Sequence, residues 1–346
     1  MVSHLPSWPF SQVLVTGIAG WLGRNLQAAL APLAVPVRGL VLPQEASSGD
    51  RHAIGDVRDP AAGAALCEGA TGAVLFHLAG VIHPRRVADF YSINVQGTRN
   101  LLQAAQAAGV QRVVVVSSNS PCGCNPYPDH RFDETSPYRP YLNYGRSKMQ
   151  MEQTVQEIHH RTGLETVIVR APWFYGPFQP PRQTLFFRMI REGRMPIVGN
   201  GQNRRSMVYL ENLCQGLLLA ATTPHANGQT YWIADERPYP THEIVDTVEH
   251  LLDTEFDRPC AHRRWHLPDW VSTAAYAVDW SLQTLGLYHP KIHVLSEMNQ
   301  TIACTIAKAQ RELGYQPAIA LTEGMRRSLH HLLAADPQAL GPIPKP

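Results

Sequence analysis

The sequence of 346 residues predicts an α/β fold, a doubly wound parallel sheet with a smaller C-terminal region. Three observations predict this fold. In the first half of the chain, short apolar runs alternate with helical patterns, which is typical of strand–helix–strand units. Each run is almost continuously apolar, as expected of strands that are buried on both faces. A glycine-rich turn joins the first run to the first helix.

The elements of this first half follow from the patterns in chain order. The expected strands are Val13–Thr16, Val37–Leu42, Val74–Leu78, Val113–Ser117 and Thr166–Val169. The helices expected between them are Trp21–Leu30, Phe90–Ala108 and Asn143–His160. Residues 94–108 place apolar or small side chains on one helical face, and Gly109 and Gly163 supply the stops after the second and third helices.

The composition changes after Arg170. Residues 171–181 are rich in proline and aromatic side chains, which favours an irregular loop that lines a ligand or forms a lid. The later elements expected are the helices Thr184–Glu192, Glu211–Ala221, Thr241–Leu252 and Leu321–Leu333 and the strand Tyr231–Ala234. The domains expected are a sheet domain over 1–175 to which 202–235 return, a substrate-binding region over 176–201 and 236–335, and a frayed tail over 336–346.

Composition and charge exclude several classes of function. The net charge is +2 without a basic stripe, so no nucleic-acid partner is expected. The six cysteines have neither C-x-x-C nor zinc-ribbon spacing, which favours the reduced thiols of a cytoplasmic protein and no metal site. No apolar stretch of about 20 residues occurs, so no membrane span is expected. We interpret the amphipathic segment Trp270–Leu287 as a helix packed on its own domain rather than a membrane-surface element.

The first strand runs into the first helix through Gly17, Gly20 and Gly23, which are spaced three residues apart. Backbone amides at such a turn and the positive end of the following helix suit a pyrophosphate, and glycine lets the anion approach closely. Two further segments, 55–57 and 77–80, follow strands and lie where an open α/β sheet binds its ligand. The sequence therefore predicts a dinucleotide site, with a tight strand–helix turn that binds no ligand as the alternative.

Tyr144 and Lys148 lie four residues apart, so on a helix they share one face. A tyrosine with a pKa of about 10 is a poor base at neutral pH, but an ammonium held beside it favours the phenolate. Such a phenol would exchange a proton with a substrate hydroxyl, while Ser118, at the end of an apolar run, would hold the substrate oxygen. The alternative for this spacing alone is an ordinary surface helix.

In combination, these residues resemble the extended short-chain dehydrogenase/reductase family. That family includes NAD-dependent epimerases and dehydratases and enzymes of the hydroxysteroid-dehydrogenase and dihydroflavonol-reductase types. The resemblance covers nearly the whole chain. Its motifs are T-G-I-A-G-W-L-G at 16–23, G-D-V-R-D at 55–59, F-H-L-A-G at 76–80, N-V-Q-G-T-R-N-L-L at 94–102, V-V-V-S-S at 114–118, Y-G-R-S-K at 144–148, Y-G-P at 175–177, R-S-M-V-Y-L-E-N-L at 205–213, Y-W-I-A-D-E-R-P at 231–238 and L-G-Y-Q-P at 313–317.

The resemblance implies a Rossmann fold, an NAD(P) cofactor and a role for each matching residue. Tyr144 would be the acid/base, Lys148 would hold the nicotinamide ribose and lower the Tyr144 pKa, and Ser118 would complete the trio, with Ser120 close enough to compete. Asn94 would brace a helix near the site. Contacts with the cofactor are implied for Gly17, Ile18, Ala19, Gly20, Trp21, Leu22, Gly23, Asp56, Val57, Leu78, Ala79, Gly80, Tyr144, Lys148 and Pro172. Asp56 and Val57 would flank the adenine.

The end of the second strand departs from the family pattern. NAD users in this family carry an acid there and NADP users a base, whereas residues 40–44 read L-V-L-P-Q and offer neither. We expect NAD, with NADP left open, because no arginine is placed for a 2′-phosphate. Family members often pair through the two long helices that flank the sheet, so the resemblance implies a homodimer built on 90–108 and 143–160.

The substrate side also departs from the pattern. Residues 118–121 read S-N-S-P and lack the Asp-Glu that the sugar-nucleotide dehydratases use to remove water, so a dehydratase is not expected. Trp173 replaces the asparagine of many sugar-nucleotide epimerases, and with Phe174 it favours a more apolar substrate. Arg204 and Arg205, by contrast, fall where those epimerases bind a diphosphate; a solvated turn is the alternative.

Three functions stay open from the sequence. The first is a dehydrogenase or ketoreductase that interconverts a secondary alcohol and a ketone on a bulky, partly apolar substrate. The second is a sugar-nucleotide epimerase, in which the hydride leaves and returns. The third is a dinucleotide sensor without catalysis, against which the intact Ser118, Tyr144 and Lys148 weigh.

Overall fold

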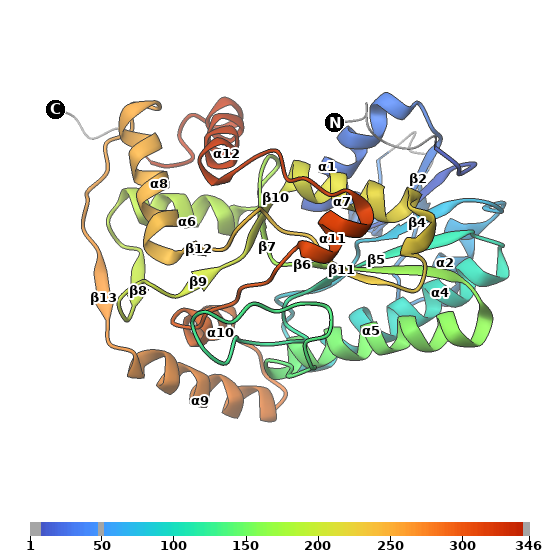
Figure 1. Cartoon of the computed structure of the whole chain (residues 1–346), viewed down its shortest axis with the longest axis horizontal. Helices are drawn as coiled ribbons and strands as arrows, with labels where there is room; N and C mark the ends of the chain where they lie inside the picture. Colours follow the sequence, from blue (N-terminus) through green and yellow to red (C-terminus); the bar gives the residue numbers. More distant parts are fainter. Residues whose placement is uncertain (1–7, 48–51, 342–346) are drawn as a thin grey trace.

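A parallel sheet lies at the centre of the computed structural model, which describes residues 8–47 and 52–341 (Figure 1). Its seven strands run in the order β11-β6-β5-β4-β1-β2-β3, and every neighbouring pair is parallel. The strands are β1 (Val13–Thr16), β2 (Val37–Val41), β3 (Ala53–Ile54), β4 (Val74–His77), β5 (Arg112–Ser118), β6 (Glu165–Ala171) and β11 (Thr230–Trp232). The predicted fold class is confirmed, and only the two-residue β3 was not predicted within this sheet.

Helices cover both faces of the sheet because neighbouring side chains of each strand point to opposite sides. Val13 and Val15 of β1 face one side, where they share a core with helices α1 (Trp21–Leu30) and α7 (Leu210–Thr222). Leu14 faces the other side. The helices packed there are α2 (Pro60–Cys67), α4 (Thr98–Ala107) and α5 (Leu142–Thr162). The first residues of α1 and α5 therefore lie at the carboxyl edge of the sheet.

The segment predicted as one helix over 90–108 has three parts. Helix α3 (Val87–Tyr91) runs into a π-helical stretch over Ser92–Gly97, and α4 follows directly. Asn94 lies inside the π stretch with its side chain buried, and Thr98 Oγ1 donates to its carbonyl at 2.7 Å. A widened turn of this kind is common at functional sites, where it re-aims a side chain.

A second, smaller core lies beside the sheet domain. It is built from α6 (Pro181–Arg191), α8 (Thr241–Thr254) and α12 (Leu321–Ala335), with Phe187, Val248 and Leu329 fully buried. Three two-stranded sheets border it: β7 (Trp173–Tyr175) with β10 (Met207–Tyr209), β8 (Pro196–Val198) with β13 (Trp265–Leu267), and β9 (Arg204–Arg205) with β12 (Tyr239–Pro240). The predicted irregular path over 171–181 is therefore wrong at β7, because Met207–Tyr209 provides a parallel partner that is distant in sequence.

The remaining helices are α9 (Trp270–Thr284), α10 (Pro290–Glu297) and α11 (Ala307–Leu313). Helix α9 lies along the lower edge of the molecule in Figure 1, and it packs against α10. Among the described residues, no helix combines the length and the apolar character needed to cross a bilayer.

The expected frayed tail does not begin at residue 336. Ala339 and Leu340 are buried, and their carbonyls accept hydrogen bonds from Arg188 at 2.8 Å and Arg191 at 2.6 Å. The two arginines of α6 thus satisfy the backbone of this segment, which the proline content alone did not indicate. Residues 342–346, the rest of the predicted tail, lie outside the described residues.

Candidate active site

A crevice is expected between β1 and β4, because the strand order changes direction there and ligands of open α/β sheets bind at such points. Gly17 follows β1 with a φ of +71°, and a Cβ atom added to it would lie 2.9 Å from the backbone nitrogen of Ala79. Thr16 Oγ1 lies 2.7 Å from His77 Nδ1 and ties the two strand ends together. Only glycine fits at this closest approach of the two segments.

The glycine turn leads into α1 without a polar cap. The backbone nitrogen of Gly20 donates to the Gly17 carbonyl at 3.0 Å, and no side chain caps the helix. A Cβ atom on Gly23 would lie 2.3 Å from the Gly17 oxygen, so the third glycine packs the helix onto the turn. Ile18 and Leu22 are buried below the turn, and Ala19 and Trp21 are half-buried on it. The turn has the shape of the predicted pyrophosphate cradle.

The residues predicted for the adenine end lie beside the end of β2. Asp56 accepts hydrogen bonds from Arg58, and this pairing lowers the pKa of the Asp56 carboxyl. Val57 is buried against Gly97. Glu45 was not predicted: its carboxylate accepts a hydrogen bond from the Leu42 nitrogen at 3.0 Å and so folds back onto the strand end. An acid therefore does stand at the end of β2, five residues beyond Leu40.

The loop after β4 is held by Asn94. Its side chain accepts a hydrogen bond from the Val81 nitrogen at 2.9 Å and donates to the Val81 carbonyl at 3.1 Å and to Ser147 Oγ at 3.1 Å. Gly80 lies so close that an added Cβ atom would be 3.3 Å from Asn94 Oδ1, while the Leu78 nitrogen donates to Thr16. Asn94 thus braces the crevice against α5, as the sequence predicted.

The candidate catalytic residues meet at the carboxyl end of β5. Ser118, the last residue of β5, is buried, and its Oγ lies 3.3 Å from Ser120 Oγ. Tyr144, in the first turn of α5, is half-buried and lies within hydrogen-bonding reach of Ser118. Lys148 is buried one turn later, and its Nζ donates to the Val116 carbonyl at 3.0 Å. The structure thus brings all four predicted residues together.

The direction expected for the Tyr144 pKa differs from the direction that its surroundings give. Burial raises the pKa of Tyr144 to about 12, although the Ser118 hydroxyl acts in the opposite direction. Burial lowers the pKa of Lys148 to about 8, with Glu152 opposing it. The lysine ammonium donates to the β5 backbone, and the loss of water around Tyr144 decides the direction of the Tyr144 shift. The resting phenol is protonated at neutral pH.

A buried ion pair lies close to Lys148. Arg170 Nη2 donates to Glu152 Oε2 at 2.8 Å, and both side chains are almost completely buried. Ser117 donates to Glu152 at 2.5 Å, and Tyr138 donates to it at 2.9 Å. Glu152 follows Lys148 by one helical turn and favours its charged form. The sequence does not reveal this pair, because Arg170 stands alone in an apolar strand and Glu152 is one of several polar residues of a helix that is distant from it in sequence.

The two predicted substrate aromatics point in different directions. Phe174 packs on Trp21 at 5.1 Å between ring centroids, and Trp21 Nε1 donates to the Pro177 carbonyl at 2.6 Å. Trp173 packs on Phe186 of α6 at 5.3 Å and remains 38% exposed. Phe174 thus lies at the glycine turn and Trp173 at the substrate region, as the alternation along a strand requires. The predicted cofactor residue Pro172 is buried between β6 and β7.

The two predicted diphosphate arginines differ in what their side chains contact. Arg205 donates to the Glu297 carbonyl at the end of α10, and its backbone forms a bridge with Ile302. The backbone nitrogen of Arg204 donates a hydrogen bond to Thr301 Oγ1. Burial lowers the pKa of Arg131, and the nearby charge of Arg204 lowers it further. Arg205 therefore anchors the segment after α10 with its side chain and Arg204 with its backbone, so the assignment to a ligand is weakened for Arg205 alone.

Sequence reasoning missed several residues around Tyr144. Arg182, in the first turn of α6, lies over the Trp21 ring at 6.0 Å and close enough to Tyr144 to act on its pKa. Phe90 contacts the Tyr144 ring at 5.7 Å and the Tyr288 ring at 5.2 Å. One charged and two aromatic side chains from distant segments therefore surround the phenol. No local sequence pattern predicts these contacts.

Comparison with known proteins gives a consistent result. The profile of the NAD dependent epimerase/dehydratase family matches residues 13–234. The uncharacterized protein y4nL of Sinorhizobium fredii is 53% identical over 333 residues, which cover 92% of this chain and 94% of that protein. The 4-hydroxy-2-methyl-3-oxo-4-farnesyl-3,4-dihydroquinoline-1-oxide ketoreductase of Stigmatella aurantiaca is 30% identical over 346 residues, which cover 96% and 99% of the two chains.

Among solved structures, the dTDP-glucose 4,6-dehydratase DesIV of Streptomyces venezuelae is similar, with 25% identity and a TM-score of 0.72. The match covers 94% of this chain and 97% of that one. The extended dehydrogenase/reductase resemblance seen in the sequence is thereby confirmed. The family profile covers well over half of the chain, and the Stigmatella relative extends the likeness across almost all of it. The chain belongs to the NAD dependent epimerase/dehydratase family.

Proposed function

We propose that this protein interconverts a secondary alcohol and a ketone on a bulky, partly apolar substrate, with NAD as its cofactor. The observation that carries the proposal is a half-buried, protonated Tyr144 within hydrogen-bonding reach of Ser118 at the crevice edge. A phenol with a pKa of about 12 holds its proton at neutral pH and can donate it. This resting state suits the reduction of a ketone.

The glycine turn fits a dinucleotide, because close packing at Gly17 and Gly23 holds the turn against α1, whose first backbone amides no side chain caps. Gly17, Gly20 and Gly23 would hold the pyrophosphate, and Glu45 would accept from a ribose hydroxyl at the end of β2. A carboxylate there favours NAD over NADP, since it repels a 2′-phosphate. When bound, the nicotinamide would supply or accept the hydride.

The chain's own residues would move the proton. Ser118 and Tyr144 would both donate hydrogen bonds to the substrate oxygen, and Tyr144 would then release its proton to that oxygen. Lys148, buried beside the β5 carbonyls, would hold the cofactor ribose and favour the phenolate that forms. Ser120 would keep Ser118 oriented through the 3.3 Å contact between their hydroxyls.

Aromatic side chains around Tyr144 support an apolar substrate. Phe90 and Tyr288 lie beside the phenol, and Trp173 remains partly exposed on the far side. The names of two relatives agree: the Stigmatella ketoreductase acts on a farnesylated quinoline oxide, and a Mycobacterium tuberculosis relative is a 3β-hydroxysteroid dehydrogenase. The engagement of Arg205 with Glu297 weighs against a diphosphate at the epimerase position.

Epimerization is the second candidate function. Arg182 favours it, because a guanidinium near the phenol and the glycine turn would suit an anionic substrate. A 4-epimerase of Escherichia coli that acts on N-acetylglucosaminyl-diphospho-undecaprenol is 29% identical over 247 residues. That substrate joins a diphosphate to a long apolar chain.

The two candidates differ in their net use of cofactor. We would supply the purified protein with NADH and bulky apolar ketones, and follow absorbance of the reduced cofactor. The proposal expects stoichiometric NADH oxidation with formation of the secondary alcohol. Inversion of a sugar without net cofactor change would instead establish the epimerase, and no reaction with any ketone would count against the proposal.

A further inference from the structure

Helix α9 presents its apolar side to the outside and its polar side to the protein. Trp270 and Trp280 are 67% and 55% exposed, and Val278 is 49% exposed. Asp279 and Gln283 are buried on the opposite side. A surface helix of a globular protein normally has the reverse arrangement, with its apolar stripe on the core.

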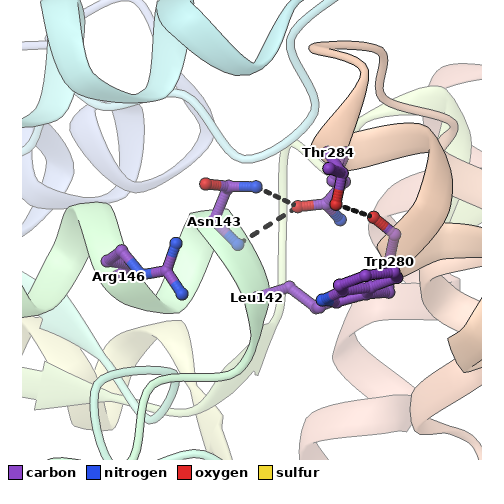
Figure 2. A pocket seen from close by; sticks show the side chains of 6 residues that line it. Leu142, Asn143, Arg146, Trp280 and Thr284 are labelled. Atoms are coloured by element: carbon purple, nitrogen blue, oxygen red, sulfur yellow. Dashed lines mark hydrogen bonds between the residues drawn. The ribbon is translucent and has the colours of Figure 1, made fainter.

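Hydrogen bonds fix α9 in this orientation. Asp279 Oδ2 pairs with His293 Nδ1 of α10 at 2.7 Å, and Gln283 Nε2 donates to Asp279 Oδ1 at 2.9 Å. The Gln283 carbonyl oxygen accepts from the backbone and side-chain nitrogens of Asn143 at 3.1 and 3.0 Å (Figure 2). Rotation of the helix would leave these buried polar groups without partners, at a cost of several kcal/mol, so the outward apolar face is specified by the sequence.

The outward face carries no charge. Asp279 is the only charged residue between Asp269 and His289, and it is fully buried. The apolar face continues past the helix end through Leu285 and Leu287, which are 75% and 53% exposed. Several large apolar side chains exposed on one uncharged face mark an interaction site on a folded protein.

Exposed cations border this face. Arg86 forms a backbone bridge with Leu287, and Arg85 precedes it in the same exposed strip. Arg146 of α5 and Trp280 line the same cavity of about 240 Å³ (Figure 2). Lys291 is exposed on α10, the helix that packs against α9. None of these four cationic side chains forms an ion pair within residues 8–47 and 52–341.

Contrary to the interpretation of Trp270–Leu287 from the sequence, we propose that α9 and the segment up to Leu287 dock on the surface of an anionic phospholipid bilayer. Tryptophan and tyrosine side chains favour the headgroup level of a bilayer, and a rim of lysine and arginine matches anionic headgroups. The cavity between Arg146 and Trp280 offers a cation beside an indole, which suits a lipid phosphate. A second copy of the chain fits less well, because a two-fold interface would place the cationic rims against each other.

The docking face adjoins the candidate active site. Tyr288, just beyond Leu287, contacts Phe90, which contacts Tyr144. Gln283 bonds Asn143, the neighbour of Tyr144 in the first turn of α5. The docking itself stands on α9 and its rim and is independent of the proposed reaction. A membrane-dissolved substrate would reach Tyr144 from this side only if both proposals hold.

The test measures binding of the full chain to vesicles without substrate. We expect the protein to float with vesicles of phosphatidylcholine and phosphatidylglycerol, and to bind vesicles of phosphatidylcholine alone at least about tenfold more weakly, since each rim cation adds about fivefold. Raising the salt concentration reduces the binding. Protein that stays with the unbound fraction in both mixtures would overturn the proposal.

Variants identify the surface. The double variant Trp270→Ser with Trp280→Ser is expected to bind the anionic vesicles more than about tenfold more weakly, since each indole buries a large apolar area. Ile54→Ser, at a 60% exposed position of β3, the edge strand of the seven-stranded sheet, is the matched control and should bind like the native protein. Equal binding of the tryptophan variant would refute the proposal.

Two further measurements complete the test. Arg85→Gln combined with Arg86→Gln should weaken binding to anionic vesicles and leave binding to neutral vesicles unchanged. An equal loss of binding to both kinds of vesicle would contradict the role of the cationic rim in binding anionic headgroups. Light scattering without lipid should give the same mass for the native protein and the tryptophan variant. A dimer that the variant abolishes would assign the face to a second copy and overturn the proposal.

Discussion

Helices α1 and α9 lie at the surfaces of the two regions and bury opposite kinds of side chain. Leu22, Leu26 and Leu30 of α1 point into the core below the sheet. Helix α9 points Asp279 and Gln283 inward and two tryptophans outward. The hydrophobic effect therefore orients the helices of the sheet domain, whereas hydrogen bonds orient α9.

Buried polar groups also differ between the two regions. In the sheet domain, Lys148, Glu152 and Arg170 gather at the carboxyl ends of β5 and β6, next to the proposed reaction. In the α9–α10 hairpin, Asp279 and His293 form a buried pair that connects two helices. We expect the first group to matter mainly for activity and the second mainly for structure, and substitutions can separate the two.

The largest effect is expected for Lys148→Met. Loss of the ammonium should lower kcat by roughly 100- to 10,000-fold, because the proton-transfer group loses its electrostatic support. The free energy of unfolding should stay equal or rise by about 1–3 kcal/mol at pH 7, since a buried charge is removed. Kinetics and urea denaturation measure the two quantities, and a large loss of stability would contradict the functional assignment of this charge.

The stability gain has a defined pH dependence. The pKa of Lys148 is lowered from 10.5 to about 8 in the folded protein, so folding disfavours its charged form. That penalty is complete below about pH 8 and disappears as the pH rises towards 10.5, where the unfolded chain also loses the proton. The difference in stability between Lys148→Met and the native protein should therefore shrink over that range.

A smaller effect is expected for Asp279→Ala, which leaves His293 and Gln283 without their partner. We expect a loss of about 3 kcal/mol in the free energy of unfolding, because one member of a buried pair is removed. Val278→Ser, the adjacent outward position, is the matched control and should change stability by no more than about 0.5 kcal/mol. Equal losses in denaturation curves would show that α9 is not oriented by its polar side.

The smallest effect is expected for Glu45→Gln. The amide still accepts the hydrogen bond from Leu42, so the fold should be unchanged, but the charge proposed to face the adenine ribose is lost. The Kd for NAD should rise about five- to tenfold, as for the loss of one charge-assisted hydrogen bond. The ratio of the Kd for NADP to the Kd for NAD should become smaller. Fluorescence titration with both cofactors measures this, and an unchanged ratio would remove Glu45 from the site.

Much of the sheet domain could be predicted from the sequence. Strands buried on both faces are continuous apolar runs, so β1, β4, β5 and β6 stood out. The glycine spacing and the four-residue separation of Tyr144 and Lys148 identify local geometry, which a sequence records directly. Ser118 could be predicted because it ends an apolar strand.

Features set by contacts between distant segments could not be predicted. The π stretch around Asn94 depends on Val81 and Ser147, and the roles of Arg182 and Arg205 depend on where α1 and α10 lie. The pattern of α9 reveals two faces but not which one is buried. Burial also reverses the pKa shift expected for Tyr144, since periodicity carries no information about desolvation.

The central claim is that the Tyr144 phenol transfers the proton. The variant Tyr144→Phe tests this claim most directly. Two quantities are measured for it: the rate of NADH-dependent ketone reduction and the Kd for NADH. We predict a loss of turnover of at least about 1,000-fold with a Kd for NADH that changes less than about threefold. Full turnover in this variant would contradict the claim.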